Sequence, residues 1–60
     1  MTTYIINGLD LEDIQFLTQV FKDNNWKYST QGRDIKVIIP KIDRFIFVRF
    51  MEGKYLFHEV

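Results

Sequence analysis

The 60-residue sequence contains no cysteine, no alanine, one histidine and one proline. The lack of cysteine excludes disulfides and thiolate metal sites, and a site of several histidines would need several chains. A chain this short buries only roughly 60% of its unfolded surface, so it usually needs a second source of stability. With disulfides excluded, we expect an oligomer or an unusually aromatic core, and the chain does carry six Phe, three Tyr and one Trp.

The chain also lacks a charge excess, because eight basic residues balance eight acidic ones. A dedicated nucleic-acid binder usually carries a basic excess, so the balance argues against that class, although a local basic patch would suffice. No apolar run approaches the roughly 20 residues that span a bilayer. The opening MTTYIING has neither the basic region nor the apolar stretch of a signal peptide. We therefore expect one domain, residues 1–60, in the cytoplasm and without a membrane partner.

The absence of alanine accompanies an abundance of Ile, Phe, Lys, Asn and Tyr. AT-rich codons favour these residues. The composition therefore indicates a low-GC bacterium, its phage or another mobile element, or an organelle as the source.

The first two thirds of the sequence predict four elements. Thr3–Asn7 is short and β-branched, which favours a strand that ends at Gly8. Apolar residues at helical spacing predict a helix over Leu11–Asn24, with Asp10 as its N-cap. Alternation then predicts two further strands, Trp26–Thr30 and Asp34–Ile39.

The last third predicts a hairpin. Pro40 cannot donate to a strand ladder and so ends the preceding strand. Arg44–Met51 and Lys54–Val60 then form two strands around a turn at Glu52–Gly53. The element order is β-α-β-β-β-β. The predicted fold class is α+β, with a single helix packed on one face of an antiparallel sheet of four to five strands.

The first strand of this hairpin is apolar on both sides. With a two-residue turn, one side faces the core under the helix, and the other carries a mixture of apolar and basic side chains. We predict this outer face as an interaction surface, because contiguous exposed apolar patches usually mark binding sites. Its residues are Phe45, Phe47, Arg49, Met51, Lys54, Leu56 and His58.

Two alternatives stay open for this surface. A three-residue turn with a bulge at Gly53 would shift the pairing by one residue and change the list of residues. The outer residues can also be ordinary exposed side chains, with basic stems lying over apolar surface.

Two functions follow from the predicted surface. The first is a small non-enzymatic interaction module that self-associates, or that binds or inhibits a protein partner. The second is a module for single-stranded nucleic acid, in which Arg49, Lys54 and His58 lie beside aromatic rings on which bases stack.

Nothing in the sequence indicates catalysis, so we expect neither an enzyme nor a cofactor. Asp10, Glu12 and Asp13 lack the ligand spacing of a calcium loop and are expected to cap the helix. His58 and Glu59 are neighbours on one strand and point to opposite faces, so they do not bind one metal ion together.

Two stretches are similar to known families. IKVIIPKIDRFIFVRFMEGKYLFHEV resembles the end of a small uncharacterised family of cyanobacteria and chloroplasts, and this resemblance implies the order of elements only. FLTQVFKDNNWKYSTQGRDIKVIIP resembles small toxin ribonucleases of the HicA type, whose working histidine follows the glycine of the first turn. In this chain Arg33 and Asp34 follow Gly32, so the resemblance implies no catalytic residue.

Overall fold

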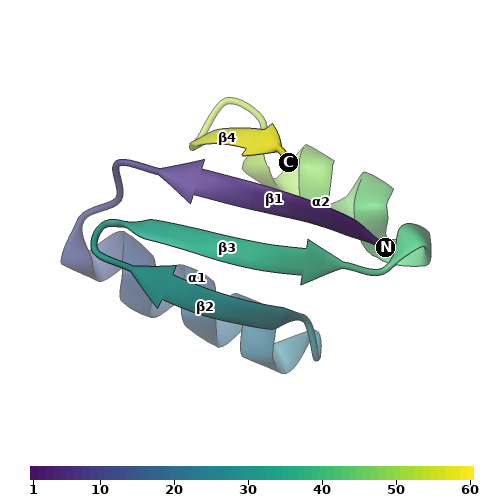
Figure 1. Cartoon of the computed structure of the whole chain (residues 1–60), viewed down its shortest axis with the longest axis horizontal. Coiled ribbons are helices and arrows are strands. Elements are labelled where there is room, and N and C mark those ends of the chain that lie inside the picture. Colours follow the sequence, from purple (N-terminus) through teal and green to yellow (C-terminus); the bar gives the residue numbers. More distant parts are fainter.

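The computed structural model describes the whole chain, residues 1–60, as a four-stranded sheet with two helices (Figure 1). A 3₁₀ turn at Lys41–Asp43 precedes the second helix. Along the sheet the strands lie in the order β2-β3-β1-β4, and every neighbouring pair is antiparallel. The elements are, in chain order, β1 (Thr2–Asn7), α1 (Leu11–Asp23), β2 (Lys27–Gln31), β3 (Asp34–Ile39), α2 (Arg44–Met51) and β4 (Leu56–Glu59).

The α+β class and the four-stranded antiparallel sheet with a helix on one face are confirmed, but one predicted element is wrong. Arg44–Met51 is a helix and not a strand, so the order is β-α-β-β-α-β with two helices. Each helix joins two strands that a third strand separates in the sheet. This arrangement is the split β-α-β, or ferredoxin-like, topology.

Tertiary packing explains why Arg44–Met51 is helical. Phe47 and Met51 lie one helical turn apart and are both completely buried, so a helix places both in the core. The β-propensity of a segment rich in Phe, Ile and Val depends strongly on such context. Pro40 has an extended backbone (φ −59°, ψ 147°) and leads from β3 into the turn before α2. Gly53 adopts a left-handed φ of 75° in the turn that follows the helix.

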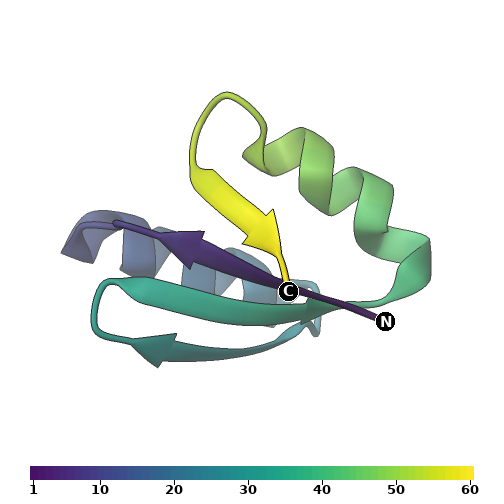
Figure 2. The same ribbon diagram turned by 45° about the horizontal axis from the view of Figure 1, so that its top comes forward.

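Both helices pack on the same face of the sheet, as Figure 2 shows. Phe47 lies at the centre of the layer between them. Its ring centroid is 4.7 Å from that of Tyr4 on β1, 5.8 Å from Phe57 on β4 and 6.2 Å from Phe21 on α1. The core consists of Tyr4, Ile6, Leu9, Leu17, Phe21, Trp26, Ile35, Val37, Ile39, Phe47 and Met51.

The ends of α1 follow the sequence signals. An Asp10 carboxylate oxygen accepts a hydrogen bond of 2.9 Å from the Asp13 backbone N–H, which confirms the predicted N-cap. At the other end Asn25 adopts a left-handed φ of 60°, and the backbone N–H of Trp26 donates to the Phe21 carbonyl at 2.9 Å. Neither helix combines the length and the apolar character needed to cross a membrane.

Two phenylalanines on α2 give a matched test of this packing. We expect Phe47→Ala to lower the free energy of unfolding by about 3–5 kcal/mol, because it leaves a cavity in the core. Phe45→Ala removes the same atoms from a side chain that is 70% exposed, and should change the free energy by only about 0.5 kcal/mol. Urea unfolding followed by circular dichroism compares the two variants, and equal losses would contradict the helical register of α2.

The N-cap gives a second prediction. Asp10→Ala removes the acceptor for the Asp13 N–H and should cost about 1 kcal/mol of stability. Asp10→Asn keeps a capping oxygen and serves as the control, with a smaller loss. The measurement is again urea unfolding, and a stability that both variants leave unchanged would show that the cap contributes nothing.

Candidate functional site

Three exposed large apolar side chains form a ridge along α2 and the 3₁₀ turn before it. Ile42, Phe45 and Ile46 are 87%, 70% and 59% exposed. Their spacing of three and four residues places them on one side of a helix. We call these three residues the outer ridge. Residues 42–51 are therefore apolar on two sides: one side fills the core, and the other side faces solvent.

Cationic side chains lie over the aromatic rings of this surface. The Arg49 guanidinium carbon is 5.6 Å from the centre of the Phe45 ring, and the Lys54 ammonium is 5.0 Å from the centre of the Phe50 ring. Phe50 in turn lies 6.3 Å from Phe16, a half-exposed residue of α1. The apolar surface thus continues from α2 towards α1, and its cations are held by attraction to the ring faces.

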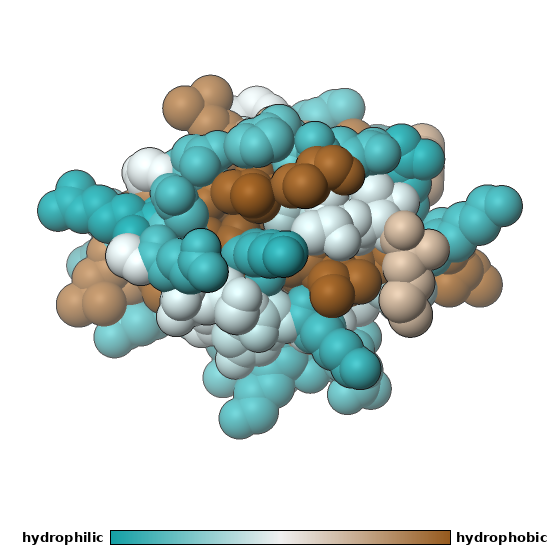
Figure 3. Space-filling model, viewed as in Figure 1, coloured by the Kyte–Doolittle hydropathy of each residue, from teal (hydrophilic) through white to brown (hydrophobic).

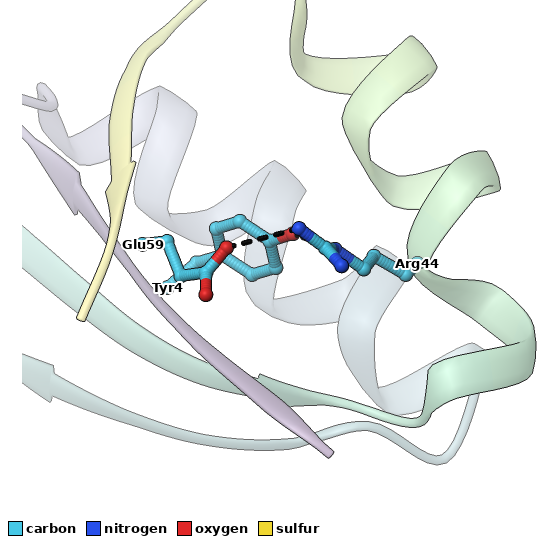
Figure 4. A network of polar contacts seen from close by, with 3 residues as sticks. All are labelled: Tyr4, Arg44 and Glu59. Atoms are coloured by element: carbon cyan, nitrogen blue, oxygen red, sulfur yellow. Dashed lines mark hydrogen bonds and ion pairs between the residues drawn. The ribbon is translucent and has the colours of Figure 1, made fainter.

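A polar network fixes the side of α2 nearest to the sheet edge (Figure 4). Arg44 Nε donates to the Tyr4 hydroxyl at 3.0 Å, and Arg44 Nη2 lies 3.1 Å from Glu59 Oε1. The hydrogen bond to Tyr4, followed by electrostatic attraction to Tyr4 and Glu59, raises the pKa of Arg44. The network joins α2 to β1 and β4, and so fixes the direction in which the outer ridge points.

A shallow groove runs along the same side of α2. It is lined by Lys41, Arg44, Phe45 and Val48. Phe45 therefore belongs both to the outer ridge and to the wall of this groove. Two of the four lining side chains are cationic, which favours anionic groups beside an apolar contact.

The face of the sheet opposite the helices is open to solvent (Figure 3). In this view apolar side chains form separate patches between polar ones. The rings of Tyr4, Tyr28 and Phe57 pack against rings of the core, on the helix side. A shallow depression on β2 and β3 is lined by Lys27, Tyr28, Ser29, Lys36 and Ile38.

The prediction that seven C-terminal residues share one face of the sheet is wrong. Phe47 and Met51 are completely buried, because α2 turns them into the core. Phe45 and Arg49 lie together on the outer side of α2, and Lys54 lies over Phe50 after the helix. The other two predicted residues, Leu56 and His58, are exposed on β4.

The three basic residues of the nucleic-acid hypothesis are likewise separated. Arg49 belongs to α2, Lys54 to the loop after it, and His58 to β4. His58 pairs with Ile5 of β1, so its neighbour across the strands is aliphatic. The predicted platform of bases stacked beside cations is therefore not formed by these residues on one sheet face.

Sequence reasoning missed two residues of the outer ridge, Ile42 and Ile46. The signal was present, because positions 42, 45, 46 and 49 follow the spacing of one helical face. It was hidden by the apolar residues between them, which fit a strand equally well.

Among the acidic residues at the start of α1, Asp10 caps the helix as predicted. No group of three or more His, Asp or Glu side chains lies close enough together to hold a metal ion.

Comparison with protein-family models, with characterised proteins and with solved structures finds no match for the chain. The two family resemblances thus stay predictions.

The Arg44–Glu59 pair gives a prediction about stability. Both side chains are 53% exposed, and ion pairs that water screens contribute little to folding. We expect Glu59→Gln to leave the melting temperature within a few degrees of the wild type, and the difference to shrink in high salt. Thermal melts at low and high salt make the comparison, and a large loss that salt does not reduce would contradict this account.

Proposed function

We propose that the chain is a non-enzymatic interaction module that binds a protein partner through the outer ridge of α2. The supporting observation is the exposure of Ile42, Phe45 and Ile46 on one helical face, in a domain whose core is already complete without them. Exposed apolar surface of this kind is typical of binding sites. The small size and AT-biased composition fit an inhibitor encoded by a phage or another mobile element and acting in the cytoplasm.

The ridge matches a known mode of recognition. An amphipathic helix binds by laying apolar side chains, spaced by three and four residues, into an apolar groove of its partner. Phe45 is the natural anchor, because aromatic residues contribute a large share of binding energy at the centre of an interface. Lys41 and Arg49 lie on the same helical segment, so we expect a partner groove with an acidic rim.

Binding of single-stranded nucleic acid is the weaker proposal. Such proteins combine a basic groove with aromatic rings on which bases stack. In this chain Tyr4, Tyr28 and Phe57 direct their rings towards the helices, although Lys27 and Lys36 line a depression on the open face. A salt-dependent mobility shift of labelled single-stranded RNA or DNA, lost in a Lys27→Glu/Lys36→Glu variant, would favour this alternative.

A displayed random-peptide library tests the proposed function. We expect selection on the immobilised protein to enrich apolar sequences with acidic residues, and their nuclear magnetic resonance shift changes to map to α2. Phe45→Asp should weaken these peptides at least roughly tenfold, because a charge would have to be desolvated at the anchor position. Gln15→Asp adds the same charge at an exposed position of α1 and should leave affinity within roughly twofold.

Two outcomes would contradict the proposal. The first is that enriched peptides shift resonances of the open sheet face and leave α2 unchanged. The second is that Phe45→Asp, folded by circular dichroism, binds them as tightly as the control.

A further inference from the structure

Strand β4 has an unpaired edge. It lies at the end of the sheet and pairs only with β1 (Figure 1). The Val60 N–H donates to the Thr3 carbonyl at 2.9 Å, and hydrogen-bonded pairs alternate along antiparallel strands. His58 therefore also directs its backbone groups at β1, whereas Phe57 and Glu59 direct theirs outward. No other backbone group of the chain pairs with these two residues.

The residues of β4 fit a second copy of the same strand. If two copies run antiparallel about a two-fold axis at His58, Phe57 of each copy faces Glu59 of the other, and the two pairs exchange their free N–H and carbonyl groups. On the open face, Leu56 of each copy then lies opposite Val60 of the other. These two side chains are 78% and 70% exposed in the single chain. The pairing covers both with apolar surface.

The opposite edge of the sheet lacks this fit. Every residue of β2, Lys27–Gln31, is exposed, and its sequence KYSTQ is mostly polar with a lysine at its start. Lysine on an edge strand discourages pairing with another chain, because its charge would have to be buried. The sequence LFHE of β4 contains neither lysine nor proline, and its one carboxylate, Glu59, forms an ion pair with Arg44 of the same chain.

We infer that the chain forms a homodimer in which β4 pairs antiparallel with β4 of a second copy, with His58 of both copies facing each other on the axis. The two sheets become one sheet of eight strands. The dimer also supplies the additional burial that a domain without disulfides needs. Because the axis is perpendicular to the sheet, both helical layers lie on the same side, and the dimer presents two outer ridges together to a bivalent partner.

A single introduced cysteine tests the register. In the proposed dimer the two His58 residues are opposite each other and share no hydrogen bond. The Cα atoms of such a pair are about 4.5 Å apart, which lies within the range that a disulfide spans. The chain has no cysteine, so His58→Cys can form a disulfide only with another copy. Ser29→Cys is the matched control, exposed in the middle of the other edge strand. At micromolar protein we expect His58→Cys to cross-link on the order of 100-fold faster than the control, because pairing brings the thiols to millimolar effective concentration.

A second variant separates pairing from folding. Leu56→Lys places a charge opposite Val60 of the second copy and should shift the dimer to monomer in sedimentation equilibrium, with an unchanged circular dichroism spectrum. The inference is overturned if the wild type sediments as a monomer up to millimolar concentration, or if His58→Cys and Ser29→Cys cross-link equally fast. Leu56 and His58 do not belong to the outer ridge. The test of the dimer can therefore fail while the test of the proposed function with Phe45→Asp succeeds, and the reverse.

Discussion

The burial of Phe47 is the contact on which the rest of the structure depends. Its ring touches the ring of Tyr4 on β1, that of Phe57 on β4 and that of Phe21 on α1, and Trp26 lies edge-on at 5.9 Å. No other aromatic ring of the core lies beside so many other rings. Once Phe47 points inward, the helical repeat decides where the other apolar residues of α2 go. Met51 follows it into the core, whereas Phe45 and Ile46 must face outward, as Ile42 does in the turn before the helix.

The polar contacts of α2 reinforce this orientation. The Trp26 indole N–H donates to Asp43 Oδ2 at 2.9 Å just before the helix, and Arg44 bonds to Tyr4 and Glu59 within its first turn. Both contacts act at the N-terminal end of α2, whereas Phe47 and Met51 hold its middle and its end. A helix of eight residues is too short to be stable alone, so these tertiary contacts must maintain it.

The clarity of the hydrophobic period decides how much of the fold the sequence predicts. The helix at Leu11–Asp23 and the strand Asp34–Ile39 were predicted to within a residue, because each has a single period and a clear boundary at Asp10 or Pro40. The segment Arg44–Met51 has apolar residues at six of its eight positions, so a helical and a strand period fit it equally well. Its tertiary contact with the core, which is not visible in a local window, selects the helix.

The same ambiguity explains why only part of the interaction surface was predicted. Excess apolar residues were correctly located in the C-terminal third, but assigning them to a strand face placed the buried Phe47 beside the exposed Phe45 and omitted Ile46. A strand alternates its sides every residue, so residues 45 and 47 share a side, whereas in a helix they lie about 200° apart. One error in secondary structure therefore exchanges core and surface.

The split topology also explains why both proposed contact regions belong to residues 40–60. Strands β1 and β3 are each paired on both edges, and α1 covers their inner face with Leu17 and Phe21. The chain then adds α2 and β4 at the β1 side of the sheet, where β4 pairs on one edge only. An apolar helix face and an unpaired strand edge therefore remain at the end of the structure.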